Sequence, residues 1–556
     1  MKKFWEKNNL VKVVGIMVVF AALLTWLIPQ AEVFRTIEVT DAEIVRLGIM
    51  DFFQYIVMVI PYFSIYFIFV FVLAAFYQVI SKIGAYQRLT SGIAKAFKSK
   101  EWIFAIIASL IFAVLAALTT EYVTLVIFIP FVITIISKMK LSKITAFAVT
   151  FGSIIVGLMG SLYNFQVAGH NVDIFGGDYA QHFWVRIALL VSAFVVFNLF
   201  NVLHIKKTLK TKKSEVVEDP FATEETPKKD GTSFNVGPWI LGAVGILFVI
   251  LSFLNAGDDL LVPAVLVVGI TLLIIAAVAK FLPKATFALL FGLFALITIL
   301  AYLPWDAFGE YGVQLFSDLT RGFIGYELTI PGIMSEVPIF AYIFGNVPAF
   351  GNWNMVTIQI LLLVTMFVMK WTYKISTDDF IASIGDGLKK VAKLAGLLLL
   401  IHAIIVITMY SNVIPTVVYW LMDRIEGFSL FFGTISAFIG SVFTIKYQFL
   451  MHLVGSHFSV TYSEYTAQLA IMFQAVYGFV AMLAPTSLLL LVGLFYSNIS
   501  YKEWLKYIWK FLIIMLLIIL SILAVVFELS IVWIILFGIF SVLSLVVLVG
   551  HTVTKK

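Results

Sequence analysis

Two hydrophobic segments of the chain are each divided by a short polar tip. The first covers Trp102–Ser137 with its tip at Thr119–Tyr122, and the second covers Phe428–Val460 with its tip at Thr444–Gln448. A hydrocarbon core of about 30 Å requires about 20 helical residues, whereas each arm of these segments has only about 12–17. The pattern predicts two re-entrant helical hairpins, whose tips must be satisfied by protein or by a watery cavity.

Longer hydrophobic segments recur along the rest of the chain. A hydrophobic content of 62%, a charged content of 12% and a mean hydropathy of +1.06 exclude a water-soluble globule. The sequence therefore predicts an all-α polytopic membrane protein with about twelve transmembrane helices. The predicted spans are Val13–Pro29, Phe52–Ile80, Ile144–Ala168, Phe183–His204, Pro238–Leu254, Leu261–Ala279, Phe287–Leu303, Met355–Met369, Val391–Tyr410, Ala467–Ser497, Phe511–Phe527 and Ile531–Gly550.

The distribution of positive charge supports this topology. With both hairpins re-entrant, the connections on one side of the membrane hold nearly all Lys and Arg residues. The other side holds four arginines: Arg35, Arg46, Arg321 and Arg424. Arg186 and Lys446 fall within membrane segments. Because Lys and Arg are enriched in cytoplasmic loops, we expect both termini in the cytoplasm of a cell, which the Lys-rich and Phe-rich usage suggests is bacterial.

The two hairpins open from opposite sides, and each precedes an interrupted span, which is typical of an inverted repeat in a transporter. The Lys/Glu-rich linker between the halves is expected to be solvated and to act as a plain tether, with a regulatory role as the alternative. The expected parts are a first half at 1–205 (hairpin about 102–137), a cytoplasmic linker at 206–236, additional spans at 237–370 with a long external loop at 304–353 that contains surface helices, a second half at 371–530 (hairpin about 428–460), and a last helix with a cytoplasmic tail at 531–556.

Glycine and polar residues interrupt the span that follows each hairpin. They are Gly157, Gly160, Ser161, Asn164 and Gln166 in the first half, and Pro485, Thr486 and Ser487 in the second. Glycine permits the backbone to unwind, so that carbonyls and half-helix ends face a solute, and amide side chains supply neutral ligands. The alternatives are close helix packing through small residues and hydroxyls that satisfy a carbonyl freed by Pro485.

Glu121 and Lys446 lie at the two hairpin tips. An ionisable group inside the membrane is costly and usually faces the bundle interior or a water path with a partner. The two side chains are expected to pair with each other or to bind opposite ends of a zwitterion. Alternatively, the tips lie closer to the surface and Lys446 reaches into an aqueous vestibule.

Other reactive side chains are few. His402, His452 and His457 lie in or near apolar helices, where His402 at mid-span is the best candidate for proton coupling and a packing role is the alternative. The chain contains no Cys, the histidines lack metal-ligand spacing, and no nucleotide-binding loop is present. We therefore expect no metal, no cofactor, no primary pump and no enzyme.

Short motifs in a fixed order cover most of the chain outside the linker and the external loop. They are Leu24-Thr25-Trp26-Leu27-Ile28-Pro29, Gly84-Ala85-Tyr86, Gly160-Ser161 with Asn164 and Gly169, Gln474, Gly478-Phe479, Pro485-Thr486-Ser487 and Lys506-Tyr507-Ile508-Trp509. This set resembles the YfcC-like and C4-dicarboxylate-carrier-like (DcuC-like) branch of the ion transporter superfamily. The resemblance implies a two-hairpin binding site, sodium or proton coupling, elevator-type motion and a homodimer.

The sequence departs from the family pattern at the site itself. The first tip reads Thr119-Thr120-Glu121 instead of a Glu-Glu-Thr type sequence, and Asn164-Phe165 replaces Asn-Pro. The second tip, which is Ser-rich in the family, reads Thr444-Ile445-Lys446 here. Tyr477 and Ala481 stand where the family usually has polar residues before Pro-Thr-Ser. Because cation ligands of the second half are depleted and an ammonium stands at the tip, we expect transport without sodium.

These observations together predict a secondary transporter of a small carboxylate-bearing solute. An amino acid is the first choice, with arginine–ornithine exchange suggested by the resemblance. A C4-dicarboxylate or another organic acid is the second, and a sensor or scaffold derived from a carrier is the third. The expected partners are the solute, the lipid bilayer and a second copy of the chain, with no nucleic acid. The candidate substrate-binding residues are Thr119, Thr120, Glu121, Ser161, Asn164, Gln166, Thr444, Lys446, Gln474, Thr486 and Ser487, with His402 as the coupling candidate.

Overall fold

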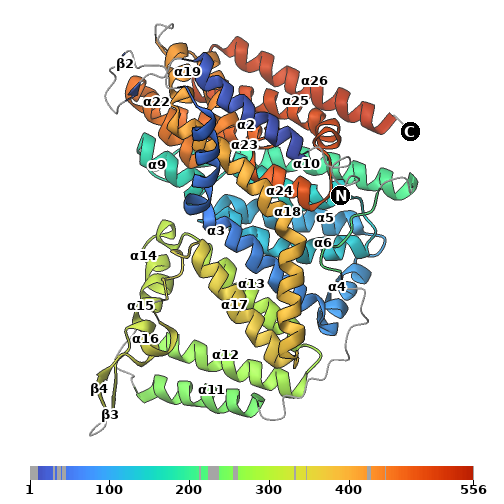
Figure 1. The fold of residues 1–556 in the computed structure, drawn as a ribbon, viewed down its shortest axis with the longest axis vertical. Coiled ribbons are helices and arrows are strands. Elements are labelled where there is room, and N and C mark those ends of the chain that lie inside the picture. Colours follow the sequence, from blue (N-terminus) through green and yellow to red (C-terminus); the bar gives the residue numbers. More distant parts are fainter. Residues whose placement is uncertain are drawn as a thin grey trace. The chain divides into compact units, whose positions relative to one another are not determined.

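The computed structural model describes residues 10–28, 32–33, 39–40, 46–211, 215–222, 237–254, 261–330, 334–345, 347–422, 427–444 and 446–554. Helices make up most of this part of the chain (Figure 1). Four short strands form two antiparallel pairs, with Glu32 opposite Thr40 in β1–β2 and Leu328 opposite Val337 in β3–β4. Their bounds are Glu32–Val33, Val39–Thr40, Leu328–Ile330 and Met334–Val337. The expected all-α polytopic fold is confirmed.

Each of the twelve predicted spans corresponds to one helix or to two half-helices. Eight helices in the described part of the chain have at least 18 residues and are apolar enough to cross a membrane. They are α2 (Leu10–Leu27), α3 (Ile49–Ser81), α5 (Glu101–Leu118), α10 (Phe183–Thr211), α17 (Met355–Thr372), α18 (Thr377–Tyr410), α25 (Tyr501–Val526) and α26 (Ile531–Thr554). The first hairpin arm, α5, is therefore long enough to span, so its length alone does not establish re-entrance.

The first-half hairpin consists of α5, the tip at 119–121, the 3₁₀ helix η1 (Tyr122–Phe128) and α6 (Ile129–Lys138). The interrupted span that follows begins at Ser142, whose side chain accepts a hydrogen bond from the Thr145 N–H and caps the helix. Its first part comprises α7 (Lys143–Phe147), the π-helical turn η2 (Ala148–Gly152) and α8 (Ser153–Met159), and its second part η3 (Phe165–Gly169) and α9 (His170–Phe175).

The second-half hairpin repeats this arrangement. Its arms are α20 (Leu430–Phe443) and the continuous run of α21 (Tyr447–Leu450), η6 (Met451–Gly455) and α22 (Ser456–Thr461). The short η7 (Ser463–Tyr465) leads into α23 (Thr466–Ala481), which breaks before α24 (Leu488–Tyr496). The short α19 (Val413–Met422), which precedes this hairpin, was not expected from the sequence.

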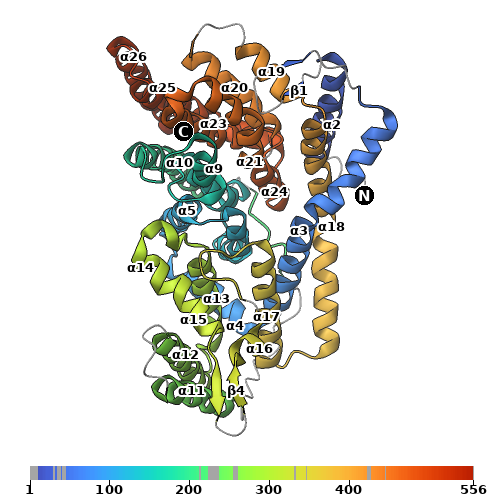
Figure 2. The same ribbon diagram turned by 90° about the vertical axis from the view of Figure 1, so that its left-hand side faces the viewer.

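Contacts divide the chain into two compact units. The first unit contains both hairpins and both interrupted spans, because it comprises Met1–Ile68, Ala94–Pro220 and Val391–Lys556. Within it, α25 and α26 lie side by side (Figures 1 and 2). A capping box at Ser500 and Glu503 starts α25. Every candidate site residue therefore belongs to one unit.

The second unit comprises Phe69–Ile93 and Phe221–Lys390. It contains most of α4 (Gly84–Ala96), which the sequence analysis did not anticipate, and α11 (Gly237–Leu254) packed along α12 (Leu261–Phe281). The expected helices of the 304–353 loop are present and are accompanied by the β3–β4 pair. The remaining elements are α13 (Thr286–Tyr302), η4 (Trp305–Phe308), α14 (Glu310–Gly312), η5 (Val313–Asp318), α15 (Leu319–Ile324), α16 (Ile339–Phe344) and α17.

Part of the expected linker is ordered against the first unit. Helix α10 continues to Thr211, and the segment after it pairs with the α6–α7 turn through Val217 N–H to Leu141 O at 3.1 Å and Lys143 N–H to Glu215 O at 3.2 Å. Val217 is buried with 3% exposure. This part of the linker is therefore docked and does not act as a free tether.

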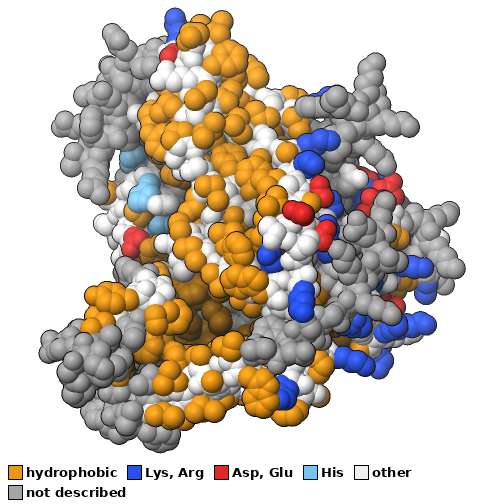
Figure 3. Space-filling view, turned by 60° about the horizontal axis from the view of Figure 1, so that its bottom comes forward, with side chains coloured by type: hydrophobic (Ala, Val, Ile, Leu, Met, Phe, Trp, Pro, Cys, Tyr) orange, Lys and Arg blue, Asp and Glu red, His pale blue; other side chains and the backbone are white. Residues whose placement is uncertain are grey.

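The surface carries the apolar side chains that a bilayer requires. Figure 3 shows hydrophobic side chains covering much of one face, with Lys and Arg gathered toward the right-hand side of the view. Ile531 and Val546 of α26 are 70% and 64% exposed. Because exposed apolar side chains of this density are unfavourable in water, this surface fits the chain's assignment as a membrane protein.

Candidate functional site

The tip of the first hairpin is built around Glu121. Helix α5 ends at Leu118, and the extended backbone of Thr119 and Glu121 turns the chain into η1. The Glu121 carboxylate accepts a hydrogen bond from the Val123 N–H at 3.4 Å, while its carbonyl accepts one from the Thr124 hydroxyl at 2.6 Å. Glu121 thus caps the returning arm and keeps its second carboxylate oxygen for other partners.

That second oxygen is bonded by a residue of the interrupted span. Nε2 of Gln166 donates to Oε2 of Glu121 at 3.1 Å. Both residues were candidates from the sequence, and the structure brings them into direct contact. The Gln166 amide orients the carboxylate and supplies a neutral donor beside it.

Lys446 lies on an aromatic surface of α3. Its ammonium donates a hydrogen bond to the Tyr66 hydroxyl and stands 4.1 Å from the Tyr66 ring centroid and 5.8 Å from that of Phe63. A cation over an aromatic face is stabilised by the ring quadrupole. The Tyr66 contribution was missed from the sequence, because Tyr66 lies in a continuous aromatic run whose pattern does not single it out.

His402 belongs to the same cluster. Its ring is 4.4 Å from Phe63 and 5.5 Å from Tyr66, measured between centroids, and its Nδ1 lies 2.8 Å from the Leu398 carbonyl oxygen. His402 is fully buried, and its Nε2 has no hydrogen-bond partner. The coupling candidate therefore lies beside Lys446 with one ring nitrogen unoccupied.

Glu121 and Lys446 interact electrostatically, but they do not form an ion pair with nitrogen and oxygen within 4.0 Å. Each charge has a nearer neutral partner, Gln166 for the carboxylate and Tyr66 for the ammonium. The expected direct pairing is thus not formed in this structure.

Three hydroxyls among the candidates are buried without a hydrogen-bond partner. They belong to Thr119, Ser161 and Thr444. Thr119 and Thr444 occupy equivalent positions, directly after α5 and α20. Because an unpaired buried hydroxyl is unfavourable, these groups are suited to contact a bound solute. Thr120 is half-buried, and Ser487 is 8% exposed.

Asn164 and Thr486 instead tie each interrupted span to its hairpin. The Asn164 amide donates to the Ala116 carbonyl at 2.8 Å, and its side-chain oxygen accepts from the Val167 N–H at 3.1 Å. The Thr486 hydroxyl donates to the Val442 carbonyl. Each side chain thus satisfies a carbonyl near the end of the first arm of its own hairpin, α5 or α20. This hydrogen bond explains why the residue is polar without invoking a solute.

Gln474 also bonds the backbone of the first interruption. Its Nε2 donates to the Ser161 and Met159 carbonyls at 3.0 and 3.3 Å, and its Oε1 accepts from Asn171 at 3.4 Å. The interrupted span of the first half is therefore held by a residue of the second half.

The glycines of the first interruption provide close packing. A Cβ at Gly157 would lie 2.3 Å from the Ala113 carbonyl oxygen, and one at Gly160 would lie 2.5 Å from the Leu190 N atom. Close packing through small residues thus accounts for Gly157 and Gly160 and brings α5 and α10 against the break. The helix also ends at Gly160, so the expected unwinding of the backbone occurs there as well.

A buried aromatic group surrounds the tips. Tyr122 shares a side-chain hydrogen bond with Tyr477, and the Tyr447 and Tyr477 rings are 5.0 Å apart between centroids. The Tyr447 hydroxyl donates to Asn171. These tyrosines place both apolar rings and hydroxyls beside the tips.

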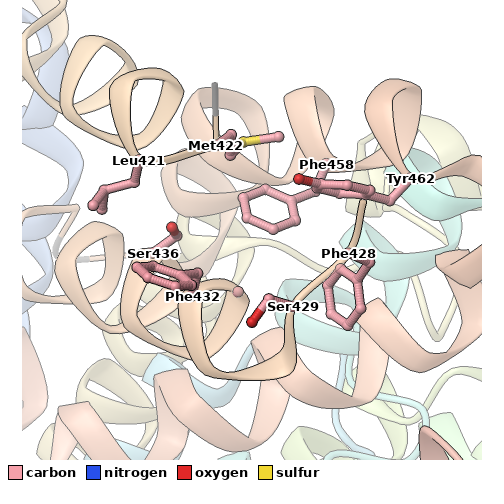
Figure 4. Close-up of a pocket in the computed structure, with 9 residues that line it drawn as sticks. Leu421, Met422, Phe428, Ser429, Phe432, Ser436, Phe458 and Tyr462 are labelled. Carbon is pink, nitrogen blue, oxygen red and sulfur yellow. The ribbon is translucent and has the colours of Figure 1, made fainter. Parts of the chain in front are cut away.

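A small pocket beside the second hairpin is apolar. Figure 4 shows Phe428, Phe432, Phe458 and Tyr462 around it, with Ser429 and Ser436 as polar side chains. The Phe428 and Tyr462 rings are 5.3 Å apart between centroids. Because no charged side chain lines this pocket, it is not suited to a carboxylate-bearing solute.

Two other histidines of the described chain, His170 and His452, lie close to each other. His170 and His452 lie with ring centroids 6.1 Å apart, and Nδ1 of His170 is 3.5 Å from Asp173. Within the described part of the chain, no group of three or more His, Cys, Asp or Glu side chains is arranged to hold a metal ion. His452 is exposed, and His457 is half-buried.

Comparison with known proteins identifies a transporter family. A sequence model of the CitMHS family, described as citrate transporters, matches residues 4–350, which is more than half of the chain. No protein with a curated description matches the sequence. Among solved structures, the chain is similar to the YdaH transporter of Alcanivorax borkumensis, with 13% identity over 94% of this chain and 98% of that chain and a TM-score of 0.35. The family match supports the transporter superfamily expected from the motifs.

Proposed function

The chain belongs to the CitMHS citrate-transporter family, and from this premise we propose that it is an elevator-type carrier of a small carboxylate-bearing solute, with an amino acid as the first choice. Family membership and the apolar helices make it a multi-pass membrane transporter and a secondary carrier, not an enzyme. The finer resemblance to the YfcC-like branch supports arginine–ornithine exchange as one pair of solutes.

The separation of Glu121 from Lys446 carries the proposal. A solute with both a carboxylate and an amine places its carboxylate at the Lys446 ammonium and the Tyr66 hydroxyl, and its amine at the Glu121 carboxylate. The Gln166 amide keeps that carboxylate oriented. The Glu121 carboxylate and the Lys446 ammonium each have a neutral side chain as their nearest partner. A dipolar solute would bring each of them an opposite charge in direct contact on binding.

A citrate-like or C4-dicarboxylate solute is the second candidate, and family membership favours it. Its carboxylates would be bound by Lys446 and by the tip hydroxyls of Thr119 and Thr444. Glu121 would then have to be protonated, because an ionised carboxylate would repel the solute. The charge state of Glu121 therefore distinguishes the two candidates.

The proposed motion carries Glu101–Ala168 and Ile381–Ser497 together against a stationary scaffold within a homodimer at the cell membrane. The hydrogen bonds from Asn164 to Ala116 and from Thr486 to Val442 support this, because they join each hairpin to its interrupted span. Light scattering on the purified protein in detergent measures the oligomeric state. A monomeric particle that transports at full rate would contradict the dimer.

Reconstituted liposomes test the solute class. Uptake of labelled arginine, ornithine, succinate and citrate is measured for the wild type and for Glu121→Gln. We expect Glu121→Gln to abolish most uptake of a cationic amino acid, and to leave dicarboxylate uptake unchanged or increased.

Glu101→Gln is the matched control. Glu101 lies at the other end of α5 and bonds the exposed Ser99 N–H, so its neutralisation should leave uptake unchanged. Unaltered amino-acid uptake by Glu121→Gln would refute the two-charge site. Absence of uptake of every solute by the wild type would instead favour a sensor or scaffold.

A further inference from the structure

Arg186 is a buried cation that the proposed solute site does not use. It lies in the first turn of α10, is 5% exposed, and forms no ion pair within 4.0 Å among the described residues. Its guanidinium instead donates to three backbone carbonyls: those of Leu162 at 2.9 Å, Gln181 at 2.8 Å and Tyr179. A buried charge normally has a counter-charge in contact, so this arrangement needs an explanation.

The three carbonyls come from two segments that the guanidinium joins. Leu162 lies in the first-half interruption, and Tyr179 and Gln181 lie in the connection that leads into α10. The Asp178 side chain accepts hydrogen bonds from the Ala180 and Gln181 N–H groups at 2.8 and 2.9 Å and shapes this connection. Several carbonyl oxygens directed at one positive charge are the ligand set with which transporters bind a monovalent cation.

The neighbouring carbonyls of the same interruption are also occupied. Gln474 donates to the Met159 and Ser161 carbonyls, so those of residues 159, 161 and 162 all accept bonds from fixed side chains. In the second half, Trp504 Nε1 donates to the Met482 carbonyl at 2.8 Å. The carbonyls of Met159, Ser161, Leu162 and Met482 are therefore satisfied from within the protein.

We propose that Arg186 is a tethered cation that takes the place of an exchangeable monovalent ion. Its guanidinium holds the break between α8 and η3 in the conformation needed for transport. The inference rests on the proposed carrier function, and it makes Arg186 a positioning residue. A dissolved cation would have to bind and leave in each cycle, whereas the guanidinium is always present. Removal of its charge should therefore leave a carbonyl cage that a small cation fills.

The surroundings leave room for such an ion. A pocket lined by Asn171, Asp178, Gln181 and Arg186 lies beside the guanidinium. Asp178 also interacts electrostatically with Arg186. A shorter neutral side chain at position 186 would expose carbonyl, amide and carboxylate oxygens to this space, and such hard oxygen ligands suit sodium or lithium.

Thermal unfolding of the purified protein tests the proposal without any solute. The Tm of wild type, Arg186→Gln and Arg186→Lys is measured in NaCl, LiCl and KCl, with choline chloride at the same ionic strength as reference. We expect the wild type to have the same Tm in all four salts. Arg186→Gln should have a lower Tm in choline chloride and recover saturably with one small cation, because a ligand that binds the folded state stabilises it. Arg186→Lys keeps the charge and should show no cation-specific recovery.

Trp504→Phe is the matched control, since it removes a neutral donor from a backbone carbonyl at the second interruption. Its Tm should fall equally in every salt. The proposal is overturned if the loss in Arg186→Gln is also equal in every salt, which would indicate a purely structural role. If Arg186→Gln cannot be purified, the wild type and Arg186→Lys are compared instead. Sodium-specific stabilisation of either protein overturns the proposal, and the absence of such stabilisation from both supports the proposal. Because no transport is measured, this result is independent of the solute assay.

Discussion

Nε2 of Gln166 lies 3.1 Å from Oε2 of Glu121, so a residue of the first interrupted span bonds the charged tip of the first hairpin. This contact couples two elements that are separated by 45 residues. It fixes the direction of the carboxylate that we propose as the amine ligand. The hairpin tip and the span are therefore joined directly by side chains.

Gln166→Leu should weaken solute binding while leaving the fold intact. Loss of the amide removes one hydrogen bond to a charged group, which contributes about 1.5–3 kcal/mol, and we expect KM to rise by about tenfold or more. Gln314→Leu is the control, because Gln314 bonds Glu310 at 3.2 Å on an exposed helix surface. Equal KM values for Gln166→Leu and the wild type would show that Gln166 does not position Glu121.

Asn164→Ala and Thr486→Val should destabilise the protein by similar amounts, because each leaves a buried carbonyl without its donor. The expected loss is about 1–3 kcal/mol for each variant, measured as a fall in Tm. Thr298→Val is the control, since its hydroxyl bonds the carbonyl of Phe294 within its own helix. Unchanged Tm values would show that these side chains do not hold the interrupted spans to their hairpins.

The all-α polytopic fold and the order of its apolar helices could be predicted from the sequence, because segment length and apolar content determine helices in a membrane. The roles of the polar residues could not. Asn164 and Gln474 were predicted to contact a solute, yet in the structure their amides bond backbone carbonyls of other segments. Tyr66 was not predicted at all, because its contact with Lys446 spans 380 residues and depends on tertiary packing.

The length of α5 gives a similar lesson. The polar tip at 119–121 correctly predicted where the arm ends, but Glu101 extends the helix to 18 residues. A charged residue at the first turn is favourable at a helix N-terminus, so the helix begins before the apolar segment does. Hydropathy alone therefore underestimated the length of this arm. Whether the hairpin is re-entrant stays a prediction that experiment can test.

Cysteine labelling in intact cells tests the topology. The chain contains no Cys, so a single Cys can be introduced without removing others. We expect Cys at position 120 to be protected, Cys at positions 213 and 556 to react only after permeabilisation, and Arg321→Cys to react from outside. Lys213 and Lys556 lie outside the described residues. External labelling at position 213 would contradict this topology.

Transport should not require sodium. A sodium ion at the second tip would be repelled by Lys446, since two unit charges about 4 Å apart interact by about 4 kcal/mol at an effective dielectric constant of about 20. The ammonium instead has the Tyr66 hydroxyl and the aromatic surface as partners. Uptake by wild-type liposomes is therefore expected to be equal in NaCl and choline chloride, with protons or a counter-solute as the driving species.

Lys446→Ala separates the two roles of this side chain. It should lower uptake strongly, because the carboxylate of the solute loses its cationic partner, whereas Lys510→Ala should not, since Lys510 bonds Thr552 away from the tips. If Lys446 also replaces a bound ion, residual uptake by Lys446→Ala should acquire a dependence on sodium that the wild type lacks. Steep sodium dependence in both proteins would mean that the cation binds elsewhere and that Lys446 does not substitute for it.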